Sequence, residues 1–304
     1  MTGGRDPRVV AALRGGTPGP TLIIIGGVHG NEPAGIAAAR DAIAAWSADA
    51  VRGEIVALVG NVRAVAAGRR HRGRDLNRMW TTEWLAAATA SPAATAAPEL
   101  AELAELAAAV DAAIARARGP VYLVDLHTTS AAGYPFGVVG PTAAHHAFAE
   151  AFPLPCIAGL EQSLTGVLTA HYGARGCITL AIEGGQHTTR AAADNLAAVL
   201  AIALEASGVV ASVPGAAAAR AHLTGARGDL PARIEIVLRH PVHPGDGFRM
   251  APGFANLQCT TAGTLLAHDA TGEIRAPFDG VVVLPLYQAD GDDGFFYGRA
   301  ETAA

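Results

Sequence analysis

The chain of 304 residues is 51% hydrophobic and 16% charged, which is ample core material for one large or two smaller globular domains. Its formal net charge of -5 gives no general attraction to nucleic acid or to anionic membranes, so small or neutral partners are expected. All 22 basic residues are arginines, which excludes lysine Schiff bases, the lysine of a Walker-type nucleotide site and lysine-attached biotin or lipoate.

The cysteines and the chain start both bear on the compartment. Cys156, Cys177 and Cys259 are widely spaced and odd in number, without a Cys-x-x-Cys motif, which favours a reducing cytoplasm. Residues 1–20 lack the apolar core of a signal peptide, and charged residues interrupt the alanine-rich stretch 191–206, so no membrane span is expected. We therefore expect a cytoplasmic protein. The sequence leaves its oligomeric state open, a homo-oligomer included.

The first strong pattern is an unbroken apolar run, Leu22–Ile25, which predicts a strand covered on both faces. His29 and Glu32 follow at its C-terminal end, where ligands bind in open α/β sheets. Both are ordinary zinc ligands, but a catalytic zinc site needs three protein ligands and an open position. An isolated His-x-x-Glu match is more often a loop histidine beside a surface glutamate. The presence of a third ligand therefore decides whether the pair belongs to a metal site.

A helix over 34–48 and a second buried strand over 54–59 follow, which establishes an alternation of strands and helices. Residues 69–78 then hold five of the arginines and contain Asp75-Leu76-Asn77-Arg78. Such a run is often a solvated face. Because it follows the end of a strand, it is also a candidate anion-binding loop that uses the planar fork of guanidinium. The residues alone leave both interpretations open.

A helix over 98–118 leads to a third apolar strand, 121–124, which delivers Asp125 and His127 to its C-terminal end. The two side chains alternate onto one face of an extended chain. Buried histidines in α/β proteins are often only hydrogen-bonded. The strand-end position shared with His29 nevertheless makes His127 the best third ligand, with Asp125 as the carboxylate that fixes its ring.

A further strand, 177–182, ends at Glu183-Gly184-Gly185. A carboxylate at a strand end, followed by glycines that let a substrate approach the backbone, is the natural general base for a zinc-activated water. The alternative is a glutamate that caps a helix or is simply solvated. We assign no role to His187, which lies just beyond.

The second part of the chain has a different pattern. A helix over 191–206 is followed by a connector of glycine, alanine and proline over 207–228, and then by short predicted strands over 234–238, 259–266 and 281–286. We predict an α/β fold, with a mostly parallel or mixed sheet covered by helices on both faces, and a small β-rich C-terminal domain. The predicted division is 1–210 and 226–304.

Taken together, the motifs resemble those of the succinylglutamate desuccinylase and aspartoacylase family, a branch of the zinc carboxypeptidase-like hydrolases. The resemblance covers residues 20 to 190 and rests on His29-Gly30-Asn31-Glu32, Asn61-x-x-Ala64, Arg70, Asp75-Leu76-Asn77-Arg78, Asp125-Leu126-His127-Thr128 and Glu183-Gly184-Gly185, in that order. It implies one zinc ion per chain, bound by His29, Glu32 and His127. It further implies Arg70 as the oxyanion-stabilising group, Asn77 and Arg78 as the clamp for a substrate carboxylate, and Glu183 as general acid and base. We expect the carboxylates of Asp75 and Asp125 to contact the metal ligands and to fix their orientation.

The chain also departs from the family pattern. Val62 follows Asn61 where many members have proline, and Arg63 is a second candidate for the oxyanion. The additional substrate-binding arginine before the catalytic glutamate has only Arg175 as an approximate counterpart. The tyrosine that the family supplies from its C-terminal part has two candidates here, Tyr287 and Tyr297, and the sequence leaves open whether either reaches the active site.

The expected function is that of a zinc-dependent amidohydrolase that converts an N-acyl amino acid into a carboxylate and a free amino acid. Two alternatives remain at this point. One is a zinc carboxypeptidase or peptide amidase that uses the same catalytic residues. The other is a non-catalytic ligand-binding module that has kept the fold and the metal.

Overall fold

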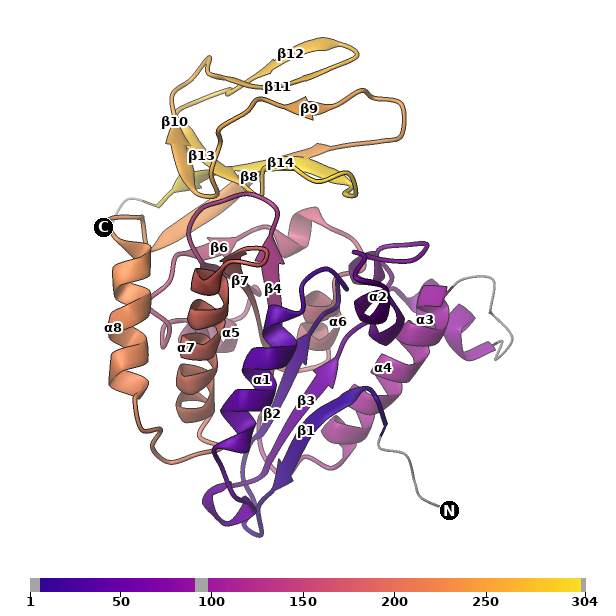
Figure 1. Ribbon diagram of the computed structural model, residues 1–304, viewed down its shortest axis with the longest axis vertical. Helices are drawn as coiled ribbons and strands as arrows, with labels where there is room; N and C mark the ends of the chain where they lie inside the picture. The colour runs from indigo at the N-terminus through magenta and orange to yellow at the C-terminus, as the bar shows by residue number, and fades with distance from the viewer. Residues whose placement is uncertain (1–5, 91–97, 302–304) are drawn as a thin grey trace.

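The computed structural model describes residues 6–90 and 98–301, and it is built around one mixed sheet of eleven strands (Figure 1). The strand order is β1-β3-β2-β4-β7-β5-β6-β8-β14-β13-β10. The strands of the first part are β1 (Val9–Arg14), β2 (Thr21–Gly26), β3 (Glu54–Val59), β4 (Val121–Thr129), β5 (Phe136–Val139), β6 (Cys156–Ala158) and β7 (Ile178–Gln186). Those of the second are β8 (Arg233–Pro241), β9 (Arg249–Met250), β10 (Gln258–Thr260), β11 (Leu265–Asp269), β12 (Gly272–Arg275), β13 (Gly280–Val283) and β14 (Asp293–Ala300).

Helices cover both faces of the sheet. They are α1 (Ala34–Ala44), α2 (Val62–Ala67), α3 (Thr82–Ala90), α4 (Pro98–Ala115), α5 (Ala143–Ala149), α6 (Leu168–Ala174), α7 (Arg190–Ala206) and α8 (Ala216–Arg227). In β2, Leu22 and Ile24 pack into the core under α1 and α7, whereas Ile23 and Ile25 pack into the core under α4 and α6. Successive side chains of a strand point to opposite faces, so an unbroken apolar run is what a strand covered on both sides requires.

The centre of the sheet is parallel. β2 pairs in parallel with β3 on one side and with β4 on the other, and β4 pairs in parallel with β7. The order of strands along the chain therefore changes sides at β2, with β3 on one side of it and β4 on the other. Open α/β sheets bind ligands at such switch points, at the carboxyl ends of the strands.

The C-terminal part extends the same sheet. β6 pairs in parallel with β8, and β8, β14, β13 and β10 continue antiparallel beyond it. A separate three-stranded sheet of β12, β11 and β9 lies at the far end of the molecule (Figure 1). The predicted α/β class and β-rich C-terminal region are confirmed. The division into 1–210 and 226–304 stays a prediction.

Several predicted element boundaries were wrong. The connector predicted over 207–228 contains helix α8, because Ala216, Ala219 and Leu223 are buried in the core shared with α7. The strand predicted over 259–266 is two strands, β10 and β11, since the chain turns at Gly263, where φ is +82°. No described helix is long and apolar enough to cross a membrane.

Candidate metal centre and active site

The turn after β2 brings His29 and Glu32 to the carboxyl edge of the sheet. Gly27 has a φ of +71°, and a Cβ on Gly30 would lie 2.1 Å from the carbonyl carbon of Ala64 in α2, so the turn depends on glycine at these two positions. The backbone N–H of Gly30 also donates to the carbonyl of Arg70. These contacts hold the turn against α2 and against the start of the basic loop.

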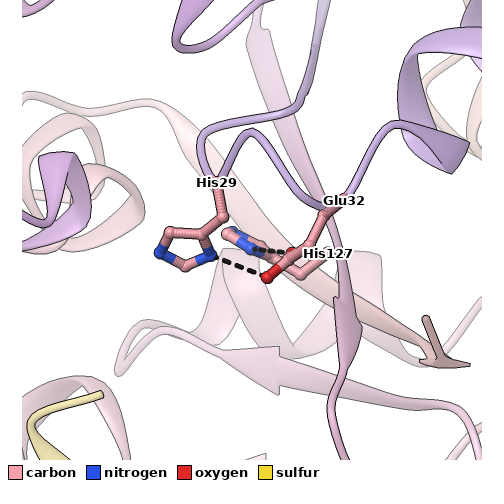
Figure 2. Close-up of side chains that lie close together, drawn as sticks. All are labelled: His29, Glu32 and His127. Atoms are coloured by element: carbon pink, nitrogen blue, oxygen red, sulfur yellow. Dashed lines mark hydrogen bonds and ion pairs between the residues drawn. The ribbon is translucent and has the colours of Figure 1, made fainter. Parts of the chain in front are cut away.

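Three metal-ligating side chains meet at this edge. One ligand atom from each of His29, Glu32 and His127 lies within 4.8 Å of the others, and all three residues are buried. Figure 2 shows both imidazoles directed at the carboxylate, with Nδ1 of His29 3.0 Å from Oε1 of Glu32 and Nδ1 of His127 3.1 Å from Oε2. The structure thus brings together the three residues that the sequence nominates as ligands.

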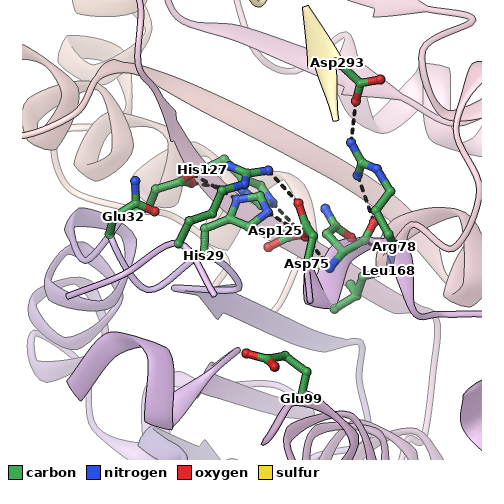
Figure 3. Close-up of polar contacts among 12 residues, drawn as sticks. His29, Glu32, Asp75, Arg78, Glu99, Asp125, His127, Leu168 and Asp293 are labelled. Atoms are coloured by element: carbon green, nitrogen blue, oxygen red, sulfur yellow. Dashed lines mark hydrogen bonds and ion pairs between the residues drawn. The ribbon is translucent and has the colours of Figure 1, made fainter. Parts of the chain in front are cut away.

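A second carboxylate stands behind each histidine. Nε2 of His29 lies 3.1 Å from Oδ1 of Asp75, and Nε2 of His127 lies 2.9 Å from Oδ2 of Asp125 (Figure 3). A neutral imidazole that donates its Nε2 proton to such a carboxylate keeps the Nδ1 lone pair for a metal ion. Two histidines, one carboxylate and two supporting carboxylates form a donor set that suits zinc.

The charges in this cluster also suit a cation. Burial opposes ionisation of Glu32, but the charges and hydrogen bonds of His29 and His127 outweigh it and hold its pKa well below the usual range. Burial likewise opposes ionisation of Asp75, yet Arg70 and His29 hold its pKa well below the usual range. Burial lowers the pKa of His127, but Asp125 and Glu32 reverse this and raise it well above the ordinary value. Metal binding would therefore displace a proton from His127.

Glu183 belongs to the same site. It lies opposite His127 in the register of β4 and β7, and it lines the pocket that the metal-ligating residues also line. Its Oε2 atom is buried without a hydrogen-bond partner. Burial raises the pKa of Glu183 to about 8, with Glu32 adding to the effect and His127 opposing it. β4 and β7 run on to Thr129 and Gln186, so His127 and Glu183 lie within the strands, whereas the prediction placed them just after the strand ends.

The basic loop supplies two guanidinium groups to the pocket. Arg70 is held by Asp75 through an ion pair of 2.7 Å, and Arg78 is the last residue of the short helical turn Leu76–Arg78. Asn77 also lines the pocket, and its Oδ1 accepts a hydrogen bond from the backbone N–H of Leu168. Glu99 of α4 accepts a hydrogen bond from the backbone N–H of Arg72, which ties the loop to the helix.

Two predicted substrate-binding residues lie elsewhere. Arg63 points toward α4, where it pairs with Glu102 at 2.7 Å and Glu105 at 3.0 Å. Arg175 pairs with Asp111 at 2.7 Å on the surface. Neither arginine lines the pocket, so both assignments need correction, whereas Arg70 and Arg78 do line it.

The C-terminal part completes the pocket without either of its candidate tyrosines. Tyr297 is fully buried and bonds to Thr260, and the hydroxyl of Tyr287 bonds to the backbone of Ala251 and Phe254. The residues that this part contributes to the pocket wall are Leu284, Pro285, Leu286, Gln288, Gly291, Asp292, Asp293 and Phe296. Asp293 is the one with a direct ionic contact to the predicted site, through Arg78.

His187 also lines the pocket, although its sequence position suggested no role. Its Nδ1 lies 2.7 Å from the hydroxyl oxygen of Thr128, the residue after His127. Burial lowers the pKa of the His187 imidazole, which favours its neutral form. The sequence signal that could have drawn attention to it is its place just after the strand end, four residues beyond Glu183.

Unpartnered polar atoms gather at this pocket. Within the described residues, buried side-chain atoms without a hydrogen-bond partner include Nε of Arg70, Nε of Arg78, Oε2 of Glu183 and Nε2 of His187, and all four residues line the pocket. Buried polar groups are nearly always hydrogen-bonded in folded proteins, so a cluster of exceptions indicates a place for a polar ligand.

Comparison with known proteins agrees with this geometry. A sequence model described as the succinylglutamate desuccinylase/aspartoacylase catalytic domain matches residues 18–224, more than half of the chain. No curated protein matched the chain by sequence.

Solved structures share the fold over nearly the whole chain. A succinylglutamate desuccinylase/aspartoacylase from Rhodobacter sphaeroides has a TM-score of 0.71 at 20% identity, covering 96% of this chain and 88% of that one. The product-bound ectoine utilization protein EutE (DoeB) from Ruegeria pomeroyi has a TM-score of 0.67 at 20% identity, covering 95% and 87%. Murine aminoacylase 3 has a TM-score of 0.62 at 19% identity, covering 93% and 95%.

Proposed function

The chain belongs to the succinylglutamate desuccinylase/aspartoacylase family of hydrolases, and from this premise we propose that it is a zinc-dependent amidohydrolase that cleaves N-acyl amino acids. The products are a carboxylate and a free amino acid. The observation that carries the proposal is the buried group of His29, Glu32 and His127 with Glu183 beside it in one pocket. A donor set of this kind next to an unpartnered carboxylate is the arrangement that metal-assisted hydrolysis needs.

The metal would be held by His29, Glu32 and His127, with Asp75 and Asp125 fixing the two imidazoles. A zinc ion bound there supplies Lewis acidity, which polarises a carbonyl group and makes water a better nucleophile at neutral pH.

Glu183 transfers a proton from the attacking water to the leaving amine. A pKa of about 8 lies near neutrality, where one carboxyl group can both accept and return a proton. As the C–O bond to the acyl carbon forms, Glu183 takes a proton from the attacking water. As the C–N bond breaks, it gives that proton to the amine nitrogen, so the overall reaction is addition of water across the amide.

Two arginines have separate tasks. Arg70 is fixed by Asp75 beside the ligands and has a buried Nε–H without a partner, so it donates to the oxygen that gains negative charge in the transition state. Arg78 lies farther along the pocket, and its free Nε–H is available to the carboxylate of the amino acid. The side-chain N–H groups of Asn77 are the neighbouring donors.

The test is hydrolysis of a panel of N-acyl amino acids by the zinc-loaded protein, by the protein after chelation, and by the chelated protein after zinc is restored. Zinc-dependent release of free amino acid is the expected result. Hydrolysis of C-terminal dipeptides without hydrolysis of acyl amino acids would favour a carboxypeptidase instead. Full zinc occupancy with no hydrolysis of either class would favour a ligand-binding module.

A further inference from the structure

The pocket contains few free positive charges for a substrate. Arg70 and Arg78 are the guanidinium groups among its described lining residues, and Arg70 is already paired with Asp75 and lies 3.6 Å from Glu32. The arginine predicted to bind a further substrate carboxylate, Arg175, is on the surface with Asp111. Arg78 is therefore the one guanidinium left for substrate carboxylates.

Arg78 is itself partly engaged. Its Nη2 donates to Oδ2 of Asp293 at 2.7 Å, and its Nη1 donates to the backbone carbonyl of Asn77 at 2.9 Å (Figure 3). The buried Nε–H has no partner. A guanidinium has five N–H donors in a fixed plane, so these contacts leave room for one carboxylate and not for two.

Asp293 is held firmly in this position. It starts β14, and its other oxygen accepts from Nε of Arg239 in β8 at 2.5 Å. Its side chain is 9% exposed, and the two ion pairs join the C-terminal strands to the basic loop of the first part. The negative charge of Asp293 is thus a fixed feature of the pocket wall.

Apart from Arg70 and Arg78, the described residues of that wall include no guanidinium group for a second anion. Glu161 lines the pocket as a buried side chain that accepts a hydrogen bond from Thr169, and Asp292 lines it beside Asp293. Between these polar groups the surface is apolar, with Leu160, Leu164, Leu284 and Phe296 among the lining residues. A charged group placed on apolar residues loses its hydration without a compensating partner.

We propose that this pocket selects N-acyl amino acids that carry a single carboxylate and otherwise uncharged, apolar groups, and that Asp293 is a residue that determines this specificity. The carboxylate binds the free edge of Arg78. Asp293 occupies the other edge, so a dicarboxylate or tricarboxylate substrate meets a like charge where it needs a cation. This inference rests on the proposed amide hydrolysis and narrows its substrate class.

The experiment compares kcat/KM for N-acetylleucine, N-acetylaspartate and N-succinylglutamate in the zinc-loaded protein and its variants. Because like charges brought together cost several kcal/mol, the wild type should favour N-acetylleucine over N-acetylaspartate at least ~100-fold. Asp293→Asn removes the negative charge that occupies one edge of Arg78, and the preference should fall at least ~10-fold, a change of about 1.4 kcal/mol. Asp293→Glu keeps the charge and should keep the preference.

Asp111→Asn is the matched control, since Asp111 also pairs with an arginine at 2.7 Å but lies outside the pocket. Its substrate preference should equal that of the wild type. A wild type that prefers N-acetylaspartate or N-succinylglutamate would overturn the inference while leaving amide hydrolysis intact, and so would an unchanged preference in Asp293→Asn. If no acyl amino acid is hydrolysed, the proposed function fails and the inference falls with it. If Asp293→Asn does not fold, the substrate preference of the wild type alone tests whether the pocket accepts only one carboxylate.

Discussion

Asp125 and His127 face each other on the same side of β4, with 2.9 Å between Oδ2 of the carboxylate and Nε2 of the imidazole. Asp125 is fully buried, and its only role visible in the structure is to hold this ring. The hydrogen bond fixes the tautomer and the orientation that leave Nδ1 free for a metal ion.

The first prediction is that Asp125→Asn binds zinc about 10- to 100-fold more weakly than the wild type, which is the usual effect of losing such a supporting carboxylate. The amide keeps the size of the side chain but can donate its N–H2 to Nε2 and favour the wrong tautomer. Titration against a coloured zinc chelator measures the affinity, with Asp111→Asn as the control for a loss of charge elsewhere. An unchanged affinity would show that Asp125 does not tune the site.

The second prediction concerns a ligand itself. His127→Ala should lose tight zinc binding, because two protein ligands do not make a zinc site of ordinary affinity. The domain should remain folded, since its two large cores on either side of the sheet do not include the ligand residues. Metal analysis and circular dichroism of the purified variant give the two readings. Near-stoichiometric zinc in a folded His127→Ala protein would remove His127 from the ligand set.

The third prediction is that Glu183→Gln lowers turnover by about 10²- to 10⁴-fold, the range typical of a lost general acid or base. Glutamine keeps the size of the side chain but accepts no proton at neutral pH. Zinc content, measured on the same preparation, should equal that of the wild type. Turnover close to normal would exclude Glu183 from proton transfer, and loss of zinc would make it a ligand.

The main features of this site were predictable from local patterns. The carboxyl ends of parallel strands meet at one edge of a sheet, so His29 after β2 and His127 near the end of β4 had to approach each other once both strands were recognised. The alternation of side chains along β4 placed Asp125 on the same face as His127. Such inferences need only short-range rules and one rule of topology.

Contacts between distant segments were not predictable in this way. Asp293 is separated from Arg78 by 215 residues, and no local pattern distinguishes it from the neighbouring acidic residues of its loop. Arg63 lies within the family motif Asn61-x-x-Ala64. Its position on α2 nevertheless directs its side chain toward Glu102 and Glu105. Helix α8 has glycine and proline nearby and forms because its buried face packs against α7.

The fourth prediction addresses stability. Glu102 of α4 is fully buried and accepts hydrogen bonds from the side chains of Arg8 and Arg63 and from the backbone of Val62 and Arg63. Removing the charge leaves buried Arg8 with the half-exposed Glu105 as its remaining carboxylate partner among the described residues, so Glu102→Gln should lower the free energy of unfolding by about 3 kcal/mol.

Urea unfolding measures this change. Glu273→Gln is the control, because its ion pair with Arg275 has the same 2.6 Å length but is half exposed, and exposed pairs contribute little. Equal, small effects in the two variants would show that the Arg8–Glu102 pair does not stabilise the fold.

The fifth prediction tests which group reads the substrate carboxylate. The free Nε–H of Arg78 and an adjacent N–H form a planar fork that binds a carboxylate through two parallel hydrogen bonds. Loss of such a pair in a desolvated pocket costs roughly 2–5 kcal/mol, much of it from the carboxylate left unpaired. Arg78→Ala should therefore lower kcat/KM for an N-acyl amino acid by about 30-fold to several thousand-fold.

Comparison of an N-acyl amino acid with its carboxamide isolates this contact, because the carboxamide keeps the shape of the substrate but lacks the charge. The wild type should strongly prefer the free acid, and Arg78→Ala should lose most of that preference. Arg78→Lys keeps the positive charge and can still pair with Asp293, but it cannot form the fork, so it should recover only part of the preference. Equal discrimination in all three proteins would assign the carboxylate to another group, and a wild type that turns over acid and carboxamide equally would contradict the deacylase proposal itself.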